Sequence, residues 1–278
     1  MDGVGASGSA LVLLAKWPGS GAAKTRLTSQ LADTDCSAAE ARKWAAAFIR
    51  AAVQDLVTRF AEAAPANAWQ CVLVYAPPVD EARAYFSGLL NEAGVTGSWR
   101  IMPVLASSDA KSASLGDILA DAARRARQAC GTRRVAFFGA DCPELPVSSM
   151  AFATKAAAND ARVAAICPAS DGGYTLLALP EAADEARCFD GVHWSASDTC
   201  LSQLAALTRA GLLCVVGETH ADVDELGDLR ALATRLRVHR VDDATQGANA
   251  PAQAAVVRCP RCEAVIAEMV QAGALSDS

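Results

Sequence analysis

Short apolar runs alternate with longer amphipathic stretches along most of this chain, and this alternation constrains the fold more than any other feature. Five runs are nearly continuous in apolar residues and are bounded by breakers: residues 10–15, 70–76, 135–140, 162–169 and 212–218. Such runs are typical of strands that are buried on both faces of a mainly parallel sheet. The stretches between them predict helices that cross back over the sheet, so the sequence indicates a layered α/β sandwich.

The predicted helices follow from their periodicity and their end signals. Ser37 and Glu40 form a capping-box pattern ahead of an alanine-rich helix that extends to about Ala64. Further helices are predicted at residues 79–93, 114–130, 147–160, 197–210 and 225–236, and a short one at 261–272. The chain is therefore expected to divide into a flexible leader, one main domain, and a linker with a C-terminal helix, over residues 1–9, 10–240 and 241–278.

Composition limits the partners of the protein. The 278 residues include 25 Lys and Arg against 31 Asp and Glu, for a net charge of −6, and 52% are hydrophobic. These values are typical of a globular chain rather than a disordered one, and the acidic balance disfavours nucleic-acid binding. No apolar run reaches the roughly 20 residues that span a membrane, and the N-terminus lacks the basic cluster of a secretory signal. We expect a cytoplasmic protein without a nucleic-acid or membrane partner.

The chain has ten cysteines, of which Cys259 and Cys262 form a C-x-x-C pair. A structural zinc site usually needs a second such pair or added histidines, and the nearest histidine in the sequence, His239, lies twenty residues upstream. The other eight cysteines stand singly, and several of them lie inside apolar runs. We therefore expect reduced, buried thiols and no zinc at this pair; a redox or metal role is the alternative.

A glycine-rich segment, AKWPGSGAAKTRL, follows the first predicted strand at residues 15–27. Gly19 and Gly21 allow close approach of the backbone to a ligand, and Lys24 and Arg26 follow at the predicted start of a helix. Backbone N–H groups, a helix N-terminus and two cations can together bind a polyphosphate. The segment fits neither the P-loop nor the dinucleotide-binding pattern. A simple glycine turn with solvated cations is the alternative, but clustered cations in an acidic chain favour anion binding.

Aspartates follow the predicted strands in three further segments. FFGADCPELP places Asp141 just past a strand, where open α/β sheets bind their ligands. PASDGGYTLLAL places Asp171 before two glycines, and ADVDELGD places Asp222 and Asp224 on one side of an extended segment. Carboxylates of this kind suit Mg²⁺ or Mn²⁺. Helix capping, or a β-turn that leads into a strand from Tyr174, would explain the same residues without any ligand.

Taken together, these segments resemble the GT-A-like bacterial transferases known as selenodomain-associated or arsenosugar-biosynthesis-type glycosyltransferases. The resemblance extends over about residues 11–232. The family patterns A-K-x-P-x-P-G-x-x-K-T-R-L, G-[TA]-D-C-P-x-L and P-A-x-D-G-G-Y-x-L-L are matched at 15–27, with Ser20 in place of the second proline, and at 139–145 and 168–177. The W-S-T and D-V-D-T-P-x-D-L elements appear with substitutions at 194–196 and 222–229.

The resemblance implies a nucleotide-diphospho-sugar transferase (GT-A) fold, which is a three-layer sandwich around a mixed, mainly parallel sheet, with residues 10–240 as its catalytic domain. It implies that Lys24 and Arg26 face phosphates and that Asp141 and Asp224 hold Mg²⁺ or Mn²⁺. A functional interpretation of the DGGY segment places Asp171 near the acceptor, so we expect Asp141 and Asp171 to act in catalysis. The residues expected to bind the nucleotide are Gly19, Gly21, Lys24 and Arg26.

Three functions are compatible with these patterns. The first is glycosyl transfer from a nucleotide sugar to a small acceptor, and the DGGY and WS elements favour it. The second is nucleotidylyl transfer, in which a nucleoside triphosphate joins a phosphorylated acceptor and pyrophosphate leaves. The third is nucleotide binding without turnover. The base, the sugar, the acceptor and the oligomeric state are left open.

Overall fold

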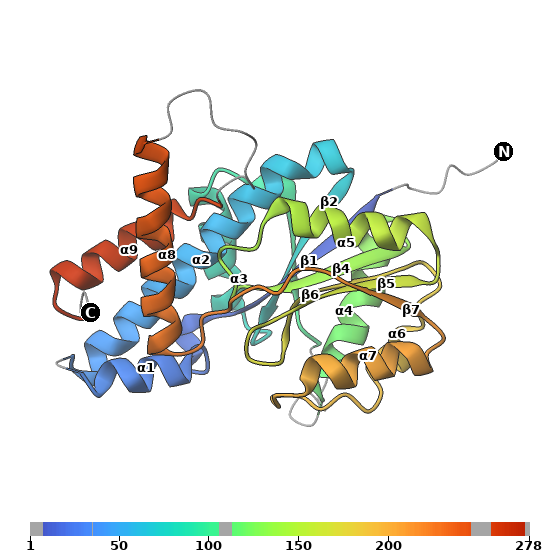
Figure 1. The fold of residues 1–278 in the computed structure, drawn as a ribbon, viewed down its shortest axis with the longest axis horizontal. Helices are drawn as coiled ribbons and strands as arrows, with labels where there is room; N and C mark the ends of the chain where they lie inside the picture. The colour runs from blue at the N-terminus through green and yellow to red at the C-terminus, as the bar shows by residue number, and fades with distance from the viewer. Residues whose placement is uncertain (1–7, 35, 106–112, 246–256, 276–278) are drawn as a thin grey trace.

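A single sheet runs through the computed structural model, which describes residues 8–34, 36–105, 113–245 and 257–275. These residues form seven strands in the order β3-β2-β1-β4-β6-β5-β7 (Figure 1). The strands are β1 (Ser9–Lys16), β2 (Trp69–Ala76), β3 (Trp99–Pro103), β4 (Arg134–Gly139), β5 (Val163–Pro168), β6 (Tyr174–Leu179) and β7 (Leu213–Val216). Neighbouring strands are parallel except at β6, which is antiparallel to both β4 and β5. The predicted mixed, mainly parallel sheet is confirmed.

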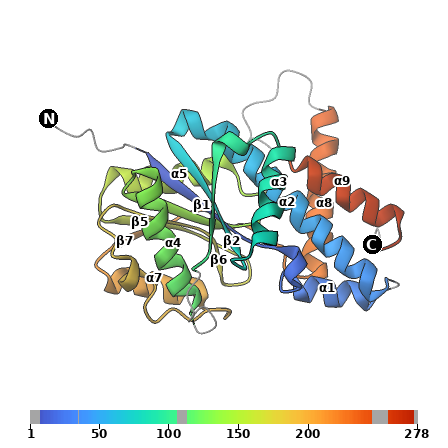
Figure 2. The same ribbon diagram turned by 180° about the vertical axis from the view of Figure 1, so that it is seen from behind.

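Helices cover both faces of this sheet. They are α1 (Thr25–Ala32), α2 (Ala38–Asn67), α3 (Asp80–Glu92), α4 (Leu115–Cys130), α5 (Val147–Asn159), α6 (Glu185–Cys188), α7 (Thr199–Arg209), α8 (Leu226–Thr245) and α9 (Pro260–Gln271). Side chains of α2, α3 and α5 bury one face, and those of α4, α6 and α7 bury the other. A third buried cluster joins α1, α2, α8 and α9 at one end of the molecule, on the left in Figure 1 and on the right in Figure 2.

All five predicted strands are present, as are the predicted helices, with boundaries shifted by a few residues except at α8, which extends to Thr245. The capping box at Ser37 and Glu40 is confirmed. Strand β3 has no counterpart in the prediction, because its five residues are mostly half-buried and carry no clear apolar run. Residues 1–7 of the predicted leader and 246–256 of the predicted linker lie outside the described residues. Among the described helices, none combines the length and apolar character that a membrane crossing requires.

All ten cysteines are free thiols, and eight of them are buried. Cys259 occupies the position just before α9 and donates a hydrogen bond from Sγ to the Pro143 carbonyl at 3.1 Å. Burial raises the pKa of Cys259 to about 12, and it also raises the pKa of Cys262 well above its usual value. Both groups are therefore protonated thiols at neutral pH. The absence of zinc at this pair stays a prediction.

A buried carboxylate fastens α9 to α2. Asp55 accepts hydrogen bonds from the backbone N–H groups of Arg261 and Cys262 at 3.2 and 3.0 Å, and it also pairs with the Arg261 guanidinium. The first N–H groups of a helix have no partner within the helix, and a carboxylate also complements the helix dipole. Asp55 thus supplies, from another helix, the cap that the side chain of Cys259 does not provide.

One turn further along α2, Arg59 holds two distant segments together. Its guanidinium donates to the carbonyls of Pro143 and Leu145 at 2.6 and 3.2 Å, and to the Arg258 carbonyl at 2.6 Å. The loop after β4 and the chain entering α9 therefore share one half-buried cation. Charge-assisted hydrogen bonds of this kind are among the stronger ones in proteins.

Removal of the Asp55 carboxylate is expected to loosen α9. The Asp55→Ala variant leaves the first N–H groups of α9 without their acceptor and removes the carboxylate partner of Arg261, so the free energy of unfolding should fall by about 2–4 kcal/mol. Urea unfolding measures this change. The control is Glu62→Ala on the exposed side of α2, expected within about 0.5 kcal/mol of wild type. Equal stability of the two variants would contradict the assigned role of Asp55.

Candidate functional site

The candidate residues meet at one edge of the sheet because of its topology. Strands β1, β4, β5 and β7 all point the same way, so their carboxyl ends share this edge. The glycine-rich segment follows β1, Asp141 follows β4, Asp171 follows β5, and Asp224 follows β7. Ligands of open α/β sheets bind at this edge.

The glycine-rich segment has a turn whose geometry depends on its glycines. Pro18–Ser20 forms a single 3-10 turn, which Gly21 ends with a φ of 70° and an N–H bonded to the Pro18 carbonyl. A Cβ at Gly19 would lie 2.4 Å from the Trp17 ring. The two glycines therefore have a conformational role here, and phosphate binding by their backbone stays a prediction.

Lys24 has an unusual conformation and an unusual position. It precedes α1 with a φ of 51°, a left-handed backbone conformation that is uncommon for residues other than glycine. Its ammonium group contacts the carboxylates of both Asp141 and Asp224, the latter at 2.5 Å, and the Lys24 side chain is only 8% exposed. Burial lowers the pKa of Lys24, but the two carboxylate charges outweigh that effect and hold the pKa above its usual value. Lys24 is thus a buried, charged link between two loops.

Two backbone contacts explain why the aspartates converge. The isolated bridge between Ala169 and His220 extends the parallel alignment of β5 and β7, and it brings Asp171 level with Asp222 two residues further on. The Val223 N–H donates to the Asp141 carbonyl at 2.9 Å, which ties the loop after β7 to the loop after β4.

Asp171, Asp222 and Asp224 form an acidic cluster, in which one carboxylate oxygen of each lies within 4.8 Å of the others. Burial, followed by the neighbouring charge of Asp171, raises the pKa of Asp222 to about 6. Among the described residues this is the one group of at least three possible metal-ligating side chains, and neither Cys259 nor Cys262 belongs to it.

The cluster fits a divalent cation. Hard oxygen donors from carboxylates are what Mg²⁺ and Mn²⁺ select, and a cation would remove the charge repulsion that, after burial, raises the pKa of Asp222. Asp224 belongs to the cluster and also contacts Lys24, whereas Asp141 reaches the cluster through that lysine. The predicted pair of metal ligands, Asp141 and Asp224, therefore lies close together with an ammonium between them.

Sequence reasoning gave Asp222 too little weight. The alternating pattern of Asp222 and Asp224 correctly indicated that both side chains point the same way. From spacing alone, helix capping is the simpler explanation for such residues. In the structure Asp228 provides the cap: its carboxylate accepts from the N–H groups of Asp224 and Glu225, each at 2.9 Å. The strand register that brings Asp171 beside Asp222 has no signal in the sequence.

Other charged residues near this edge have partners of their own. Arg26 is 65% exposed and lies 3.7 Å from the Glu225 carboxylate, so its guanidinium remains accessible. Glu144, another acidic residue after β4, pairs with Arg235 at 2.7 Å. Glu144 therefore fixes its loop against α8 and does not join the acidic cluster.

Asp171 lies in a tight turn that packs against the segment before α7. Its Oδ1 accepts a hydrogen bond from the Gly173 N–H at 2.8 Å. Gly172 has a φ of 93°, and a Cβ there would lie 1.9 Å from the Ser197 carbonyl oxygen. The Gly172 carbonyl in turn accepts from the Cys200 N–H at 2.9 Å. The turn and the neighbouring loop hold Asp171 in place together.

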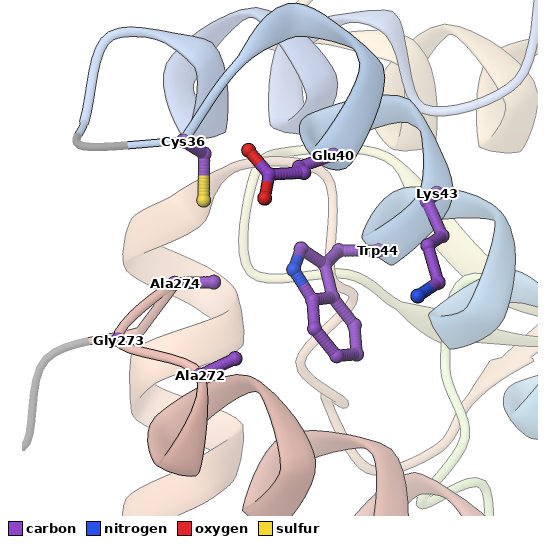
Figure 3. A pocket seen from close by; sticks show the side chains of 7 residues that line it. All are labelled: Cys36, Glu40, Lys43, Trp44, Ala272, Gly273 and Ala274. Atoms are coloured by element: carbon purple, nitrogen blue, oxygen red, sulfur yellow. The ribbon is translucent and has the colours of Figure 1, made fainter.

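A pocket of about 400 Å³ opens elsewhere, between the start of α2 and the end of α9 (Figure 3). It is lined by Cys36, Glu40, Lys43, Trp44, Ala272, Gly273 and Ala274. None of the candidate residues lines it, so this pocket is not part of the site at the sheet edge.

Comparison with known proteins identifies the family. Residues 57–196 match the model of DUF2064, described as an uncharacterized protein conserved in bacteria. The chain belongs to the DUF2064 family. The matched region contains Asp141 and Asp171 but neither Lys24 nor the segment that follows β7. No curated protein matches the chain.

Solved structures share the fold. A provisionally assigned nucleotide-diphospho-sugar transferase from Desulfovibrio desulfuricans matches with a TM-score of 0.71 and 21% identity, over 96% of each chain. The chain therefore has the nucleotide-diphospho-sugar transferase (GT-A) fold that was predicted. A mannosyltransferase from Pyrobaculum calidifontis in complex with GDP-Man and Mn²⁺ matches with a TM-score of 0.42 and 12% identity, over 97% of this chain and 76% of that one. A score this low supports no inference about the present chain.

A methyl group at Gly172 is expected to disrupt the Asp171 turn. In Gly172→Ala the strained φ and the contact with the Ser197 carbonyl should lower the free energy of unfolding by at least about 2 kcal/mol. The control is Gly88→Ala in α3, where the added Cβ meets nothing within 4 Å and alanine favours the helix. Thermal unfolding of both variants is the measurement, and a Gly172→Ala protein as stable as the control would be inconsistent with this packing.

Proposed function

We propose that this protein is a metal-dependent transferase that uses a nucleotide-activated donor and passes a glycosyl group from a nucleotide sugar to a small acceptor. The observation that carries the proposal is the convergence of Lys24 with four aspartates at the carboxyl edge of the sheet. A buried cation beside clustered carboxylates suits a ligand that brings both phosphate oxygens and a divalent cation. The shared fold supports the same activity by analogy.

The donor-binding side of the site is assigned to residues that follow β1, β4 and β7. Lys24 and the accessible Arg26 would face the diphosphate, with Gly19 and Gly21 shaping the loop beside it. Asp141 and Asp224, with Asp222 as an additional ligand, would hold Mg²⁺ or Mn²⁺. When bound, the metal ion would stabilise negative charge on the diphosphate leaving group.

The acceptor side is assigned to the turn that contains Asp171. The Asp171 side chain is exposed, and one carboxylate oxygen is already occupied by the Gly173 N–H. The other oxygen is therefore suited to take the proton of an acceptor hydroxyl. In that step the acceptor oxygen bonds to the anomeric carbon, the bond from that carbon to the phosphate oxygen breaks, and the nucleoside diphosphate leaves. The catalytic unit would be residues 10–240, which contain all of these groups.

Turnover should be detectable with nucleotide sugars. Purified protein incubated with GDP-mannose, UDP-glucose or UDP-N-acetylglucosamine and Mg²⁺ or Mn²⁺ should release nucleoside diphosphate from at least one donor, slowly to water and faster when an acceptor is present. Asp141→Asn should lower that rate at least about a hundredfold, because a metal-facing carboxylate is lost. The control is Asp160→Asn, an exposed aspartate at the end of α5, which should retain the wild-type rate.

The products distinguish the competing functions. Release of pyrophosphate from nucleoside triphosphates with a phosphorylated acceptor, and no diphosphate from any nucleotide sugar, would assign nucleotidylyl transfer instead. Nucleotide binding with neither product would leave a binding module. The family that the sequence resembles suggests an acceptor of the arsenosugar-biosynthesis type. This more specific proposal predicts that acceptors of that class increase the release of nucleoside diphosphate.

A further inference from the structure

Lys24 occupies the position between the two carboxylates that were predicted to share the metal. Its ammonium contacts Asp141 and Asp224 at once, and the side chain is almost completely buried. A divalent cation shared by Asp141 and Asp224 would have to displace this ammonium. A cation held by Asp171, Asp222 and Asp224 would still bind beside it, because Asp224 belongs to both groups.

Displacement of Lys24 by a free metal ion is unfavourable. A buried ammonium that loses its carboxylate partners retains the cost of desolvation without the compensating attraction. A metal ion that leaves Lys24 in place is repelled by it across a short distance. In either position, Lys24 lowers the affinity of the site for metal alone.

A nucleotide changes this balance because its phosphates supply new partners for the lysine. A phosphate oxygen can accept from the Lys24 ammonium while Asp141 and Asp224 turn to the metal ion that the same phosphates coordinate. No buried charge is then left unpaired. Lys24 stands between the glycine-rich turn and α1, where its backbone is left-handed. The side chain that contacts the aspartates therefore begins beside the turn where the phosphates of a nucleotide would bind.

We propose that Lys24 is the residue that restricts this site to a metal–nucleotide complex, by acting as the counter-ion of Asp141 and Asp224 until phosphate replaces them. This inference rests on the proposed function for the identity of the ligand, a nucleotide. The weak binding of a metal ion without nucleotide can be measured whether or not the protein turns over a substrate. Because binding free energies are linked, metal and nucleotide should raise each other's affinity by the same factor.

Metal binding without any substrate tests the exclusion directly. Protein-bound Mn²⁺ is measured by ultrafiltration and electron paramagnetic resonance, first with Mn²⁺ alone. Lys24→Met, which keeps the aliphatic stem, should bind Mn²⁺ at least about tenfold more tightly than wild type. The control is Arg26→Met, which removes a cation two residues away that pairs with Glu225 and touches neither aspartate. It should change the affinity less than about threefold. If Lys24→Met binds no more tightly than Arg26→Met, the proposal is overturned.

A second measurement uses wild-type protein, so that it does not depend on the folding of a variant. Saturating GDP or UDP should tighten Mn²⁺ binding at least about tenfold in wild type. In Lys24→Met this gain in Mn²⁺ affinity should be smaller, because there is no ammonium that the phosphates could draw away from Asp141 and Asp224. Wild type that binds Mn²⁺ equally well with and without either nucleotide would overturn the proposal. Absence of turnover with intact coupling would instead count against the proposed function alone.

Discussion

The contact of one ammonium with two carboxylates is the interaction on which the candidate site depends. Lys24, Asp141 and Asp224 come from loops after three different strands, and without the lysine the two aspartates would face each other as like charges. The Lys24 side chain is buried, so the two carboxylates, rather than water, compensate its charge. The surrounding structure therefore has to hold these loops at a distance that suits one small cation.

The loops are fixed by contacts that lie outside the site. The parallel alignment of β5 and β7 continues past both strands and sets Asp171 beside Asp222, while the hydrogen bond from Val223 to Asp141 joins the other pair of loops. Behind Asp141, Arg59 binds the Pro143 and Leu145 carbonyls, and it extends the same support to the start of α9. Helix α9 thus helps to hold the loop that carries Asp141, although it contributes no side chain to the candidate site.

The sequence predicted the sheet and the edge at which the site lies, because buried strands and breakers leave strong local patterns. It predicted Lys24, Asp141, Asp171 and Asp224 as candidates for the same reason: each follows a strand. It could not predict that Lys24 binds the two aspartates, since that orientation depends on a left-handed backbone and on a tertiary contact. It gave no reason to select Asp222 as a metal ligand, because Asp222 lies beside Asp171 only through the alignment of β5 with β7. Strand β3 was missed because a mostly half-buried strand has no apolar signature.

Lys24 and Asp224 are separated by 200 residues along the chain, and Asp141 lies between them. During translation the glycine-rich loop leaves the ribosome long before its second carboxylate partner has been made. Domains fold as units once enough of the chain is available, so a nascent chain that ends before β7 has the lysine and one aspartate without the charge that completes them. The proposed site is therefore complete only after β7 has been synthesised, and chains truncated before that point lack one of its carboxylates.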